Sequence, residues 1–128
     1  MTATAKRKRY LRNKAFKLLR EVCLKREPKC VVCGKMGYDG HHFIPRSLCQ
    51  HLQLDLDNLV TLCRADHIAL EWRKDPEITN RIIEARPKNW ATELYKKRRE
   101  VQPSIWSVQY LEAKVEELQK ILTTLPTT

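Results

Sequence analysis

All four histidines fall in one short stretch of the chain, and three of them lie with an asparagine in the order His41, His42, Asn58 and His67. A neutral imidazole has a pKa that suits it to accept a proton from an attacking water. Imidazole nitrogens also bind divalent metal ions, which stabilise negative charge on phosphoryl and departing oxygens. These residue types therefore suit metal-assisted hydrolysis of a phosphodiester, with the two adjacent histidines dividing the roles of base and metal ligand.

Local structure must position the histidine pair. Neighbouring side chains in a regular strand point to opposite faces, so we expect Gly40 to permit a bulge or kink that lets His41 and His42 share one site. Alone, the pair could equally be two histidines at an exposed strand end. Apolar periodicity and breaker residues predict strand, loop, strand and helix at residues 38–44, 45–56, 57–63 and 64–74.

The predicted helix carries a second pair of metal-binding residue types. Glu71 follows His67 by four residues, which places both side chains on one helical face, where a single ion can bind both. The plain alternative is an exposed pair on the helix surface. Asn58 has an alternative too, because an asparagine that enters a strand often forms an Asx turn.

Residues 30–71 resemble the HNH, or His-Me finger, endonuclease family. The family pattern is Cys-x2-Cys, (Asp/His)-His-Ile-x-Pro-(Arg/Gln)-Ser, Asn-Leu and Leu-Cys-x2-Cys-His-x3-His. The resemblance covers about a third of the chain, and it is specific because order, spacing and flanking residues agree. In this chain the corresponding segments are Cys30-Val31-Val32-Cys33, His41-His42-Phe43-Ile44-Pro45-Arg46-Ser47, Asn58-Leu59 and Leu62-Cys63-Arg64-Ala65-Asp66-His67-Ile68-Ala69-Leu70-Glu71.

The resemblance implies a ββα-metal core and a role for each matching residue. His42 would be the general base, while His41 and His67 would bind the catalytic ion. Asn58 would orient the loop and the base. Glu71 stands where some family members have a further histidine ligand, which makes it a candidate third ligand.

The cysteines predict a second, structural metal. The chain has five cysteines, and the spacing Cys30-x2-Cys33 is too tight for a good structural disulfide framework. Thiolates of Cys30, Cys33 and Cys63 can hold zinc, with Asp66 at the family's fourth cysteine position. Asp66 could instead favour the positive end of a helix dipole, leaving the loop residues Cys49 and His51 as substitutes, or the thiols could pack without metal. Cys23 is expected to be a buried thiol.

Charge points to a polyanionic partner. The 128 residues suit a single domain and carry 25 Lys and Arg against 15 Asp and Glu, for a net charge of +10. Residues 6–20 hold eight basic residues and no acidic one, which favours phosphate contact over a merely solvated face. The candidate DNA contacts are Lys6, Arg7, Lys8, Arg9, Arg12, Arg46, Lys96, Lys97, Arg98 and Arg99.

Helices are expected on both sides of the core. Helical spacing of apolar residues predicts a helix over residues 8–26, and Asp75-Pro76 begins another. The last helix has an apolar seam that serves either packing on the domain or a homodimer. The single domain 1–128 then comprises a basic helix (1–28), a zinc knuckle and core (29–74) and C-terminal helices (75–128), with the seam at Val108, Leu111, Val115, Leu118 and Leu122.

The sequence thus predicts a mostly helical α+β protein that cleaves duplex or branched DNA with Mg²⁺ or Mn²⁺, or with Zn²⁺ or Ni²⁺. By the resemblance, the products would carry a 5′-phosphate and a 3′-hydroxyl, and phage packaging, recombination or homing would be the setting. No apolar run suits a membrane span or a signal segment, so a cytoplasmic location is expected, the host's if the protein is phage-encoded. The alternative is a non-catalytic, zinc-stabilised module that binds nucleic acid.

Overall fold

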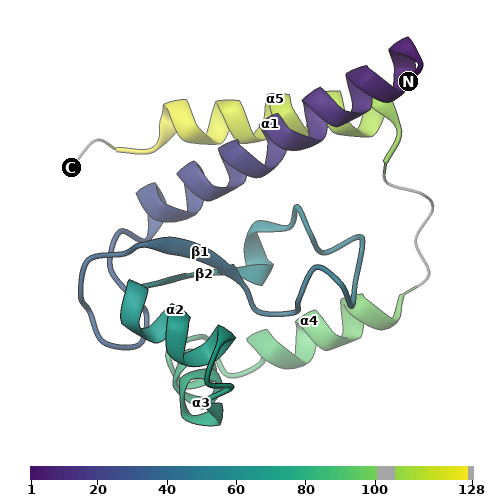
Figure 1. Ribbon diagram of the computed structural model, residues 1–128. Helices are drawn as coiled ribbons and strands as arrows, with labels where there is room; N and C mark the ends of the chain where they lie inside the picture. Colours follow the sequence, from purple (N-terminus) through teal and green to yellow (C-terminus); the bar gives the residue numbers. More distant parts are fainter. Residues whose placement is uncertain (101–105, 127–128) are drawn as a thin grey trace.

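The computed structural model describes residues 1–100 and 106–126. Within them, helices predominate around one two-stranded antiparallel sheet, which confirms the predicted α+β class. Figure 1 shows α1 on one side of the sheet and α2 on the other. In chain order the elements are α1 (Ala3–Arg26), β1 (Asp39–His42), a 3-10 turn (Leu56–Asn58), β2 (Leu59–Leu62), α2 (Arg64–Glu71), α3 (Pro76–Glu84), α4 (Trp90–Arg99) and α5 (Val108–Thr124).

Helix α1 begins five residues earlier than its apolar spacing predicts. The Thr2 hydroxyl accepts a hydrogen bond from the backbone N–H of Ala5 at 3.0 Å and so caps the first turn. The helix ends at Arg26, two residues before Pro28, which disfavours helical backbone just before it. Its buried face is formed by Leu11, Ala15, Leu18, Leu19, Val22 and Cys23.

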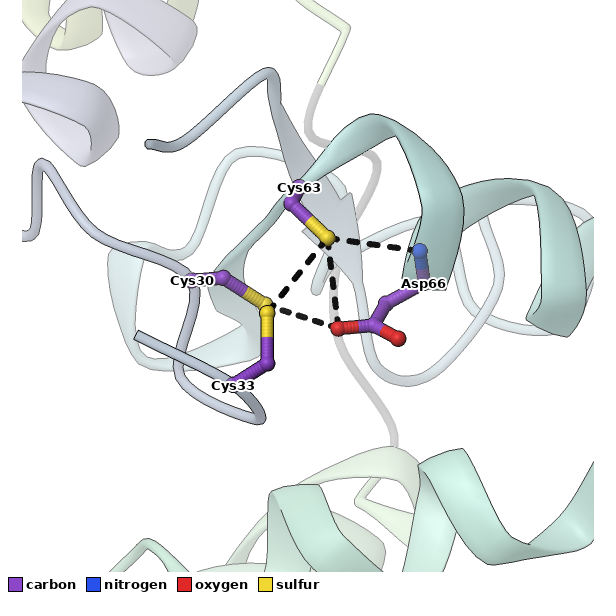
Figure 2. A group of neighbouring side chains, drawn as sticks. All are labelled: Cys30, Cys33, Cys63 and Asp66. Carbon is purple, nitrogen blue, oxygen red and sulfur yellow. Dashed lines mark hydrogen bonds between the residues drawn. The ribbon is translucent and has the colours of Figure 1, made fainter. Parts of the chain in front are cut away.

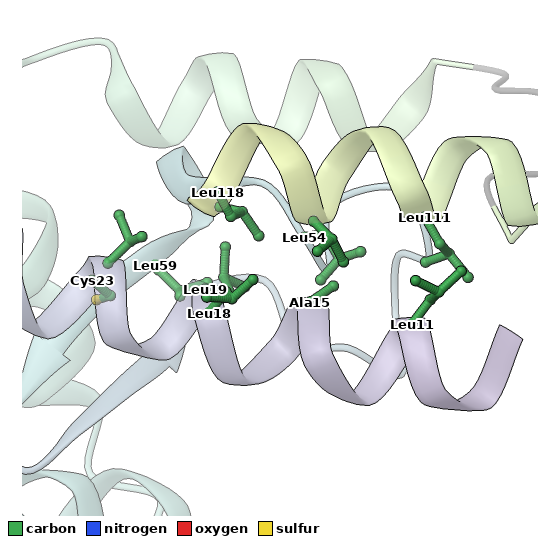
Figure 3. Close-up of a cluster of buried hydrophobic side chains, with 11 residues drawn as sticks. Leu11, Ala15, Leu18, Leu19, Cys23, Leu54, Leu59, Leu111 and Leu118 are labelled. Atoms are coloured by element: carbon green, nitrogen blue, oxygen red, sulfur yellow. The ribbon is translucent and has the colours of Figure 1, made fainter. Parts of the chain in front are cut away.

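Helix α5 runs parallel to α1 and buries its apolar seam against it. Figure 3 shows Leu111 beside Leu11 and Leu118 toward the other end of α1. Ion pairing between Arg7 and Glu112 near one end agrees with this direction, as does a hydrogen bond from Lys25 to the Leu122 carbonyl at the other. The seam is therefore used within one chain, and the predicted homodimer through it is not supported.

The sheet is regular, so the bulge expected at Gly40 is absent. Residues Asp39 to His42 of β1 pair in unbroken register with Leu62 to Leu59 of β2. Gly40 serves a different purpose: a Cβ there would lie 3.2 Å from the Cys23 sulfur and 3.4 Å from the Cys23 Cβ. The glycine thus lets α1 pack directly on the first strand.

The second strand is shorter than predicted because a 3-10 turn precedes it. Asp55 caps this turn by accepting a hydrogen bond from the Asp57 backbone N–H at 2.9 Å. Asn58 ends the turn and is not a strand residue. All four residues of β2 are buried, since the strand lies at the centre of the molecule and contributes to two apolar clusters.

Three short helices follow β2. Helix α2 ends at Glu71, three residues before the predicted end, and Lys74 then adopts a positive φ of 54°. The predicted cap is confirmed at α3, where the Asp75 carboxylate accepts from the Glu77 backbone N–H with Pro76 at the first helical position. Among the described residues, no helix is long and apolar enough to cross a bilayer.

Candidate functional site

His41, His67 and Glu71 form a group of potential metal ligands, here called the histidine cluster. One ligand atom from each lies within 4.8 Å of the others. His41 Nδ1 is 3.3 Å from Glu71 Oε1, and His67 Nε2 is 3.8 Å from the same oxygen. The structure therefore brings His41 of the first strand next to His67 of the helix, the two metal ligands that the family resemblance implies, and places the candidate third ligand Glu71 beside both.

The protonation of His41 suits metal binding. Its pKa is lowered to about 4: burial is the main cause, Glu71 opposes it, and the nearby His67 and His42 add to the lowering. The imidazole is therefore neutral at pH 7, which is the form that coordinates metals. Two imidazoles and one carboxylate are a donor set that transition ions such as Mn²⁺, Zn²⁺ and Ni²⁺ accept, whereas Mg²⁺ prefers oxygen ligands. The residues present fit such an ion.

His42 faces the opposite side of the strand, toward α1. Its Nε2 lies 2.8 Å from the Gln53 carbonyl oxygen, which can only accept, so Nε2 carries the proton. Nδ1 is then left as an acceptor. Burial lowers the pKa of His42 and a neighbouring Arg46 lowers it too, although the bond to Gln53 opposes this. The ring is thus a neutral imidazole with a fixed tautomer, as a general base requires.

Asn58 is fully buried and holds the loop that follows the histidine pair. Its Oδ1 accepts a hydrogen bond from the Ile44 N–H at 2.8 Å. Its Nδ2 donates to the carbonyls of Ile44 at 3.0 Å and Leu52 at 3.2 Å. The same residue accepts from the Phe43 N–H through its backbone carbonyl. Asn58 therefore orients the loop containing Arg46 and Gln53, which is a positioning role.

Both histidines of the pair border one pocket of about 660 Å³, although they face opposite sides of the sheet. Because β1 is an edge strand, a pocket along its open edge can reach both faces. The bulge predicted at Gly40 is thus unnecessary. The pocket is lined by the histidine cluster, His42, Arg20, Arg46, Lys74 and apolar parts of α1.

Arg46 is held at the pocket by an aromatic ring. Its guanidinium carbon lies 3.9 Å from the centre of the Phe16 ring, a separation typical of a cation–π contact. The same ring meets His42 edge-on, with centroids 6.3 Å apart. Phe16 of α1 therefore contacts both the candidate base and the candidate phosphate ligand.

The second group of potential ligands, here called the cysteine cluster, consists of Cys30, Cys33, Cys63 and Asp66 (Figure 2). The Asp66 Oδ2 atom lies 3.2 Å from the Cys30 sulfur and 3.3 Å from the Cys63 sulfur. The Cys33 and Cys63 sulfurs are 3.6 Å apart, which excludes a disulfide. A tetrahedron with zinc–sulfur bonds of ~2.3 Å has edges of ~3.8 Å, so the cluster could hold a structural metal such as zinc.

Local backbone geometry builds this cluster. Gly34 adopts a positive φ of 76° and its N–H bonds to the Cys30 carbonyl, which turns the chain so that Cys33 returns toward Cys30. Cys63 caps α2, where its sulfur accepts from the Asp66 N–H at 3.4 Å. The helix start therefore presents a sulfur and a carboxylate to the turn.

Electrostatics in the cysteine cluster favour a cation. The Lys35 backbone lowers the pKa of Cys33, but burial and the adjacent Asp66 and thiols outweigh it and raise this pKa to about 12. The Asp66 pKa is raised by burial and lowered more by hydrogen bonds from the three thiols, so the carboxylate is ionised. Removing the proton from the Cys33 thiol is therefore costly unless a metal ion compensates the charge.

Cys49 and His51, considered as substitute zinc ligands, lie elsewhere. They contact one another at 3.5 Å, and His51 Nε2 lies 2.6 Å from the Lys97 carbonyl. Neither belongs to the cysteine cluster. The substitution of Asp66 by these loop residues is therefore wrong. Cys23 is buried as expected, with its sulfur 3.5 Å from the Thr61 hydroxyl.

The predicted DNA contacts fall into three groups. The five basic residues at the start of α1 are exposed, although Arg7 approaches Glu112 at 3.9 Å. Arg46 borders the pocket. On α4, Lys97 forms ion pairs, because its ammonium lies 3.4 Å from Asp55 and 3.5 Å from Asp57. Its basic neighbours Lys96, Arg98 and Arg99 are exposed to solvent.

Sequence reasoning missed several residues in or next to the pocket. Phe16 lines the pocket but looks like one more apolar residue of α1, and Gln53, which contacts His42, contributes only a backbone carbonyl, which every residue has. Lys74 and Arg20 belong to charged stretches that indicate exposure without indicating a site. For Lys74, its position three residues after Glu71 is the one available signal.

A family model described as HNH endonuclease matches residues 30–71. This range begins at the first residue of the cysteine cluster, includes the histidine pair and Asn58, and ends at Glu71, the last member of the histidine cluster. Curated proteins and solved structures gave no match to the chain. The match therefore bears on the segment that carries both clusters, and the helices α1 and α5 lie outside it.

Proposed function

We propose that this chain, whose residues 30–71 belong to the HNH endonuclease family, is a metal-dependent endonuclease that hydrolyses DNA phosphodiester bonds. The observation that carries the proposal is the convergence at one pocket of a three-donor metal cluster, a neutral histidine with a fixed tautomer and an arginine held against the Phe16 ring. Phosphodiester hydrolysis needs a base, a counter-charge and a phosphate ligand.

Each group has a task in this mechanism. His42 accepts the proton of the attacking water at Nδ1, because Nε2 is occupied by Gln53. The water oxygen forms a bond to phosphorus while the bond to the 3′ oxygen breaks, leaving a 5′-phosphate and a 3′-hydroxyl. Arg46 holds a non-bridging oxygen of the scissile phosphate.

The metal would be held by His41, His67 and Glu71. A divalent cation bound there would supply positive charge to the phosphoryl group and to the departing oxygen. Glu71 is half exposed and the cluster borders the pocket, so the three side chains lie where a substrate can reach them. The donor set favours Mn²⁺, Zn²⁺ or Ni²⁺ over Mg²⁺.

The cysteine cluster would hold a structural zinc. Cys30 and Cys63 are buried among apolar residues of β2 and α3, so an ion there stabilises the turn and the start of α2. The exposed cations of α1 would contact phosphates away from the scissile bond, giving affinity without sequence choice. A phage setting, in packaging, recombination or homing, rests on the resemblance of the motif alone.

The rival is a non-catalytic module that binds nucleic acid around a zinc-stabilised core. A binder has use for the cysteine cluster and the basic helix, but it has none for a base and three metal donors at one pocket. Incubating the purified protein with supercoiled plasmid tests the two. Relaxation or linearisation with Mn²⁺ or Mg²⁺, absent without added ion, supports the enzyme. Binding of the plasmid with no cleavage under any ion supports the module.

A further inference from the structure

A row of exposed side chains runs along α2 beside the histidine cluster. Arg64, Ile68 and Trp72 are spaced by four residues and so form one ridge of this helix. His67 and Glu71 form the adjacent ridge by the same spacing. Trp72 continues the helical backbone, since its N–H bonds to the Ile68 carbonyl. The two ridges therefore lie side by side on one helix.

The row is unusually apolar for a surface. The Trp72 ring is 82% exposed and Ile68 is 36% exposed. Tyr38, 49% exposed, extends the row at the start of α2: the Arg64 guanidinium lies 5.9 Å from its ring centre, and the His67 ring lies 6.5 Å away. We call Tyr38, Arg64, Ile68 and Trp72 the aromatic row.

Cations lie within and directly after the aromatic row. Arg64 belongs to it, while Arg73 and Lys74 directly follow Trp72 and are exposed. Lys74 also borders the pocket, which is lined in addition by Arg46, by Glu71 and by Arg20, whose guanidinium is ion-paired with Asp39 at 2.8 Å. An exposed aromatic surface set among cations matches a ligand with flat apolar faces and a negative backbone. This charge complementarity favours a nucleic-acid strand over a protein partner.

We propose that the aromatic row binds bases of an unpaired strand, so that the site takes single-stranded DNA or unpaired segments in preference to intact duplex. In a duplex each base face is covered by the neighbouring base pair, so a protein aromatic ring can reach it only if that base-pair step is unstacked. In a single strand the faces are free, and each stack on an aromatic ring contributes to affinity. This inference rests on the proposed nuclease function.

The dimensions agree with this proposal. The eight residues of α2 span ~12 Å at a rise of ~1.5 Å per residue, a length on the scale of a few nucleotides of a single strand. Tyr38 and Trp72 stand near the two ends of this length, and His67 lies between them. A strand that stacks on both rings would therefore place an intervening phosphate at the histidine cluster.

The test is binding of a labelled oligothymidylate and of a blunt duplex of equal length, measured by fluorescence anisotropy without added divalent ion. Trp72→Ala should weaken binding of the single strand by about 5- to 100-fold, the range expected for one lost stack. Duplex affinity should stay within about twofold. Because Trp72 is almost wholly exposed, its removal should leave the circular dichroism spectrum and melting temperature unchanged.

Matched variants separate stacking from apolar area. Trp72→Phe keeps an aromatic face and should retain most of the single-strand affinity, while Trp72→Leu keeps apolar area without a face and should behave like Trp72→Ala. Met36→Ala removes a side chain of similar exposure, 79%, from the turn of the cysteine cluster and should change neither affinity. In cleavage assays, the parent's preference for single strand over duplex should fall in Trp72→Ala.

Other outcomes overturn the inference. Equal loss of affinity for both substrates would mean that the ring contacts duplex as well, and no loss for either would remove it from the interface. Self-association that Trp72→Ala abolishes, with DNA binding unchanged, would make the row a contact between two copies. Trp72→Ala could also cleave plasmid in a metal-dependent way with the parent's strand preference. This result would overturn the inference about the aromatic row and leave the proposed nuclease function intact.

Discussion

The two clusters of potential metal ligands both use α2, but they meet solvent in different ways. Cys63 caps the helix and Asp66 lies in its first turn, and two of the cluster's sulfurs are buried among core residues. His67 and Glu71 follow one turn later and border an open pocket. Four protein donors with no open position are typical of structural sites, even where one of them, here Cys33, is exposed, whereas three donors beside a cavity leave room for substrate.

This contrast teaches that one helix can serve stability at its start and chemistry at its middle. Loss of a buried ligand should reduce stability first, and loss of a pocket ligand should reduce activity with the fold intact. The predictions below test whether the two clusters separate in this way.

The largest effect is expected at the cysteine cluster. Cys63→Ser should remove bound zinc and lower the free energy of unfolding by more than ~4 kcal/mol, as loss of a structural metal does. Elemental analysis should find about one zinc per parent chain and none in the variant, and denaturant titration should measure the loss in stability.

Asp66→Cys refines the same prediction, because it restores the fourth thiolate of the family pattern. It should keep or tighten the zinc if Asp66 is a ligand. A parent that is fully folded and free of zinc as purified would mean that the thiols only pack.

The next largest effect concerns the base. His42→Ala should slow plasmid cleavage by ~10²–10⁴-fold while DNA affinity stays nearly constant, because a general base acts on water and not on binding. The two quantities should be measured on one preparation, by single-turnover cleavage and by anisotropy. Nicking at the parental rate would remove His42 from the mechanism.

Asn58, which belongs to neither cluster, should affect stability less than the cysteine cluster does. Asn58→Ala removes three hydrogen bonds from a fully buried site, and each buried polar group left unpaired costs about 1–3 kcal/mol. The free energy of unfolding should fall by at least ~3 kcal/mol, and cleavage should slow because the loop with Arg46 loosens. Unchanged stability would show that the loop is held by other contacts.

The smallest effect per residue concerns the basic end of α1. Neutralising four of Lys6, Arg7, Lys8, Arg9 and Arg12 should weaken binding to all DNA sequences alike. The slope of log affinity against log salt should flatten by ~0.9 per lost phosphate contact on duplex DNA. If affinity and slope stay constant, these exposed cations form only a solvated face, and the contacts must be sought at Arg46 and the free cations of α4.

Local signals allowed much of the fold to be predicted. Asp75-Pro76 marks a helix start by its own capping chemistry, and His67 with Glu71 share a face because of helical spacing alone. The order and spacing of the motif identified the HNH segment, which the family match confirms. Such features depend on neighbours within a few residues, which a sequence displays directly.

Features that depend on distant packing could not be predicted. The seam of α5 has the same pattern whether its partner is another chain or α1, so the pattern could not show that α1 covers it. Gly40 has a role only because α1 passes over it, with Cys23 at 3.2 Å from a would-be Cβ. Lys97 resembles its basic neighbours until Asp55 and Asp57 are brought beside it.

The central claim is that the two clusters have separate roles. The histidine cluster binds the ion on which cleavage depends, and the cysteine cluster stabilises the fold. Calorimetric titration of Mn²⁺ into the parent and into His41→Ala and His67→Ala, with zinc content and melting temperature measured in parallel, tests it most directly. We predict one Mn²⁺ site in the parent that both variants weaken together with plasmid cleavage, while zinc content and melting temperature stay unchanged. Parental Mn²⁺ affinity in both variants, or loss of zinc from either, would contradict the claim.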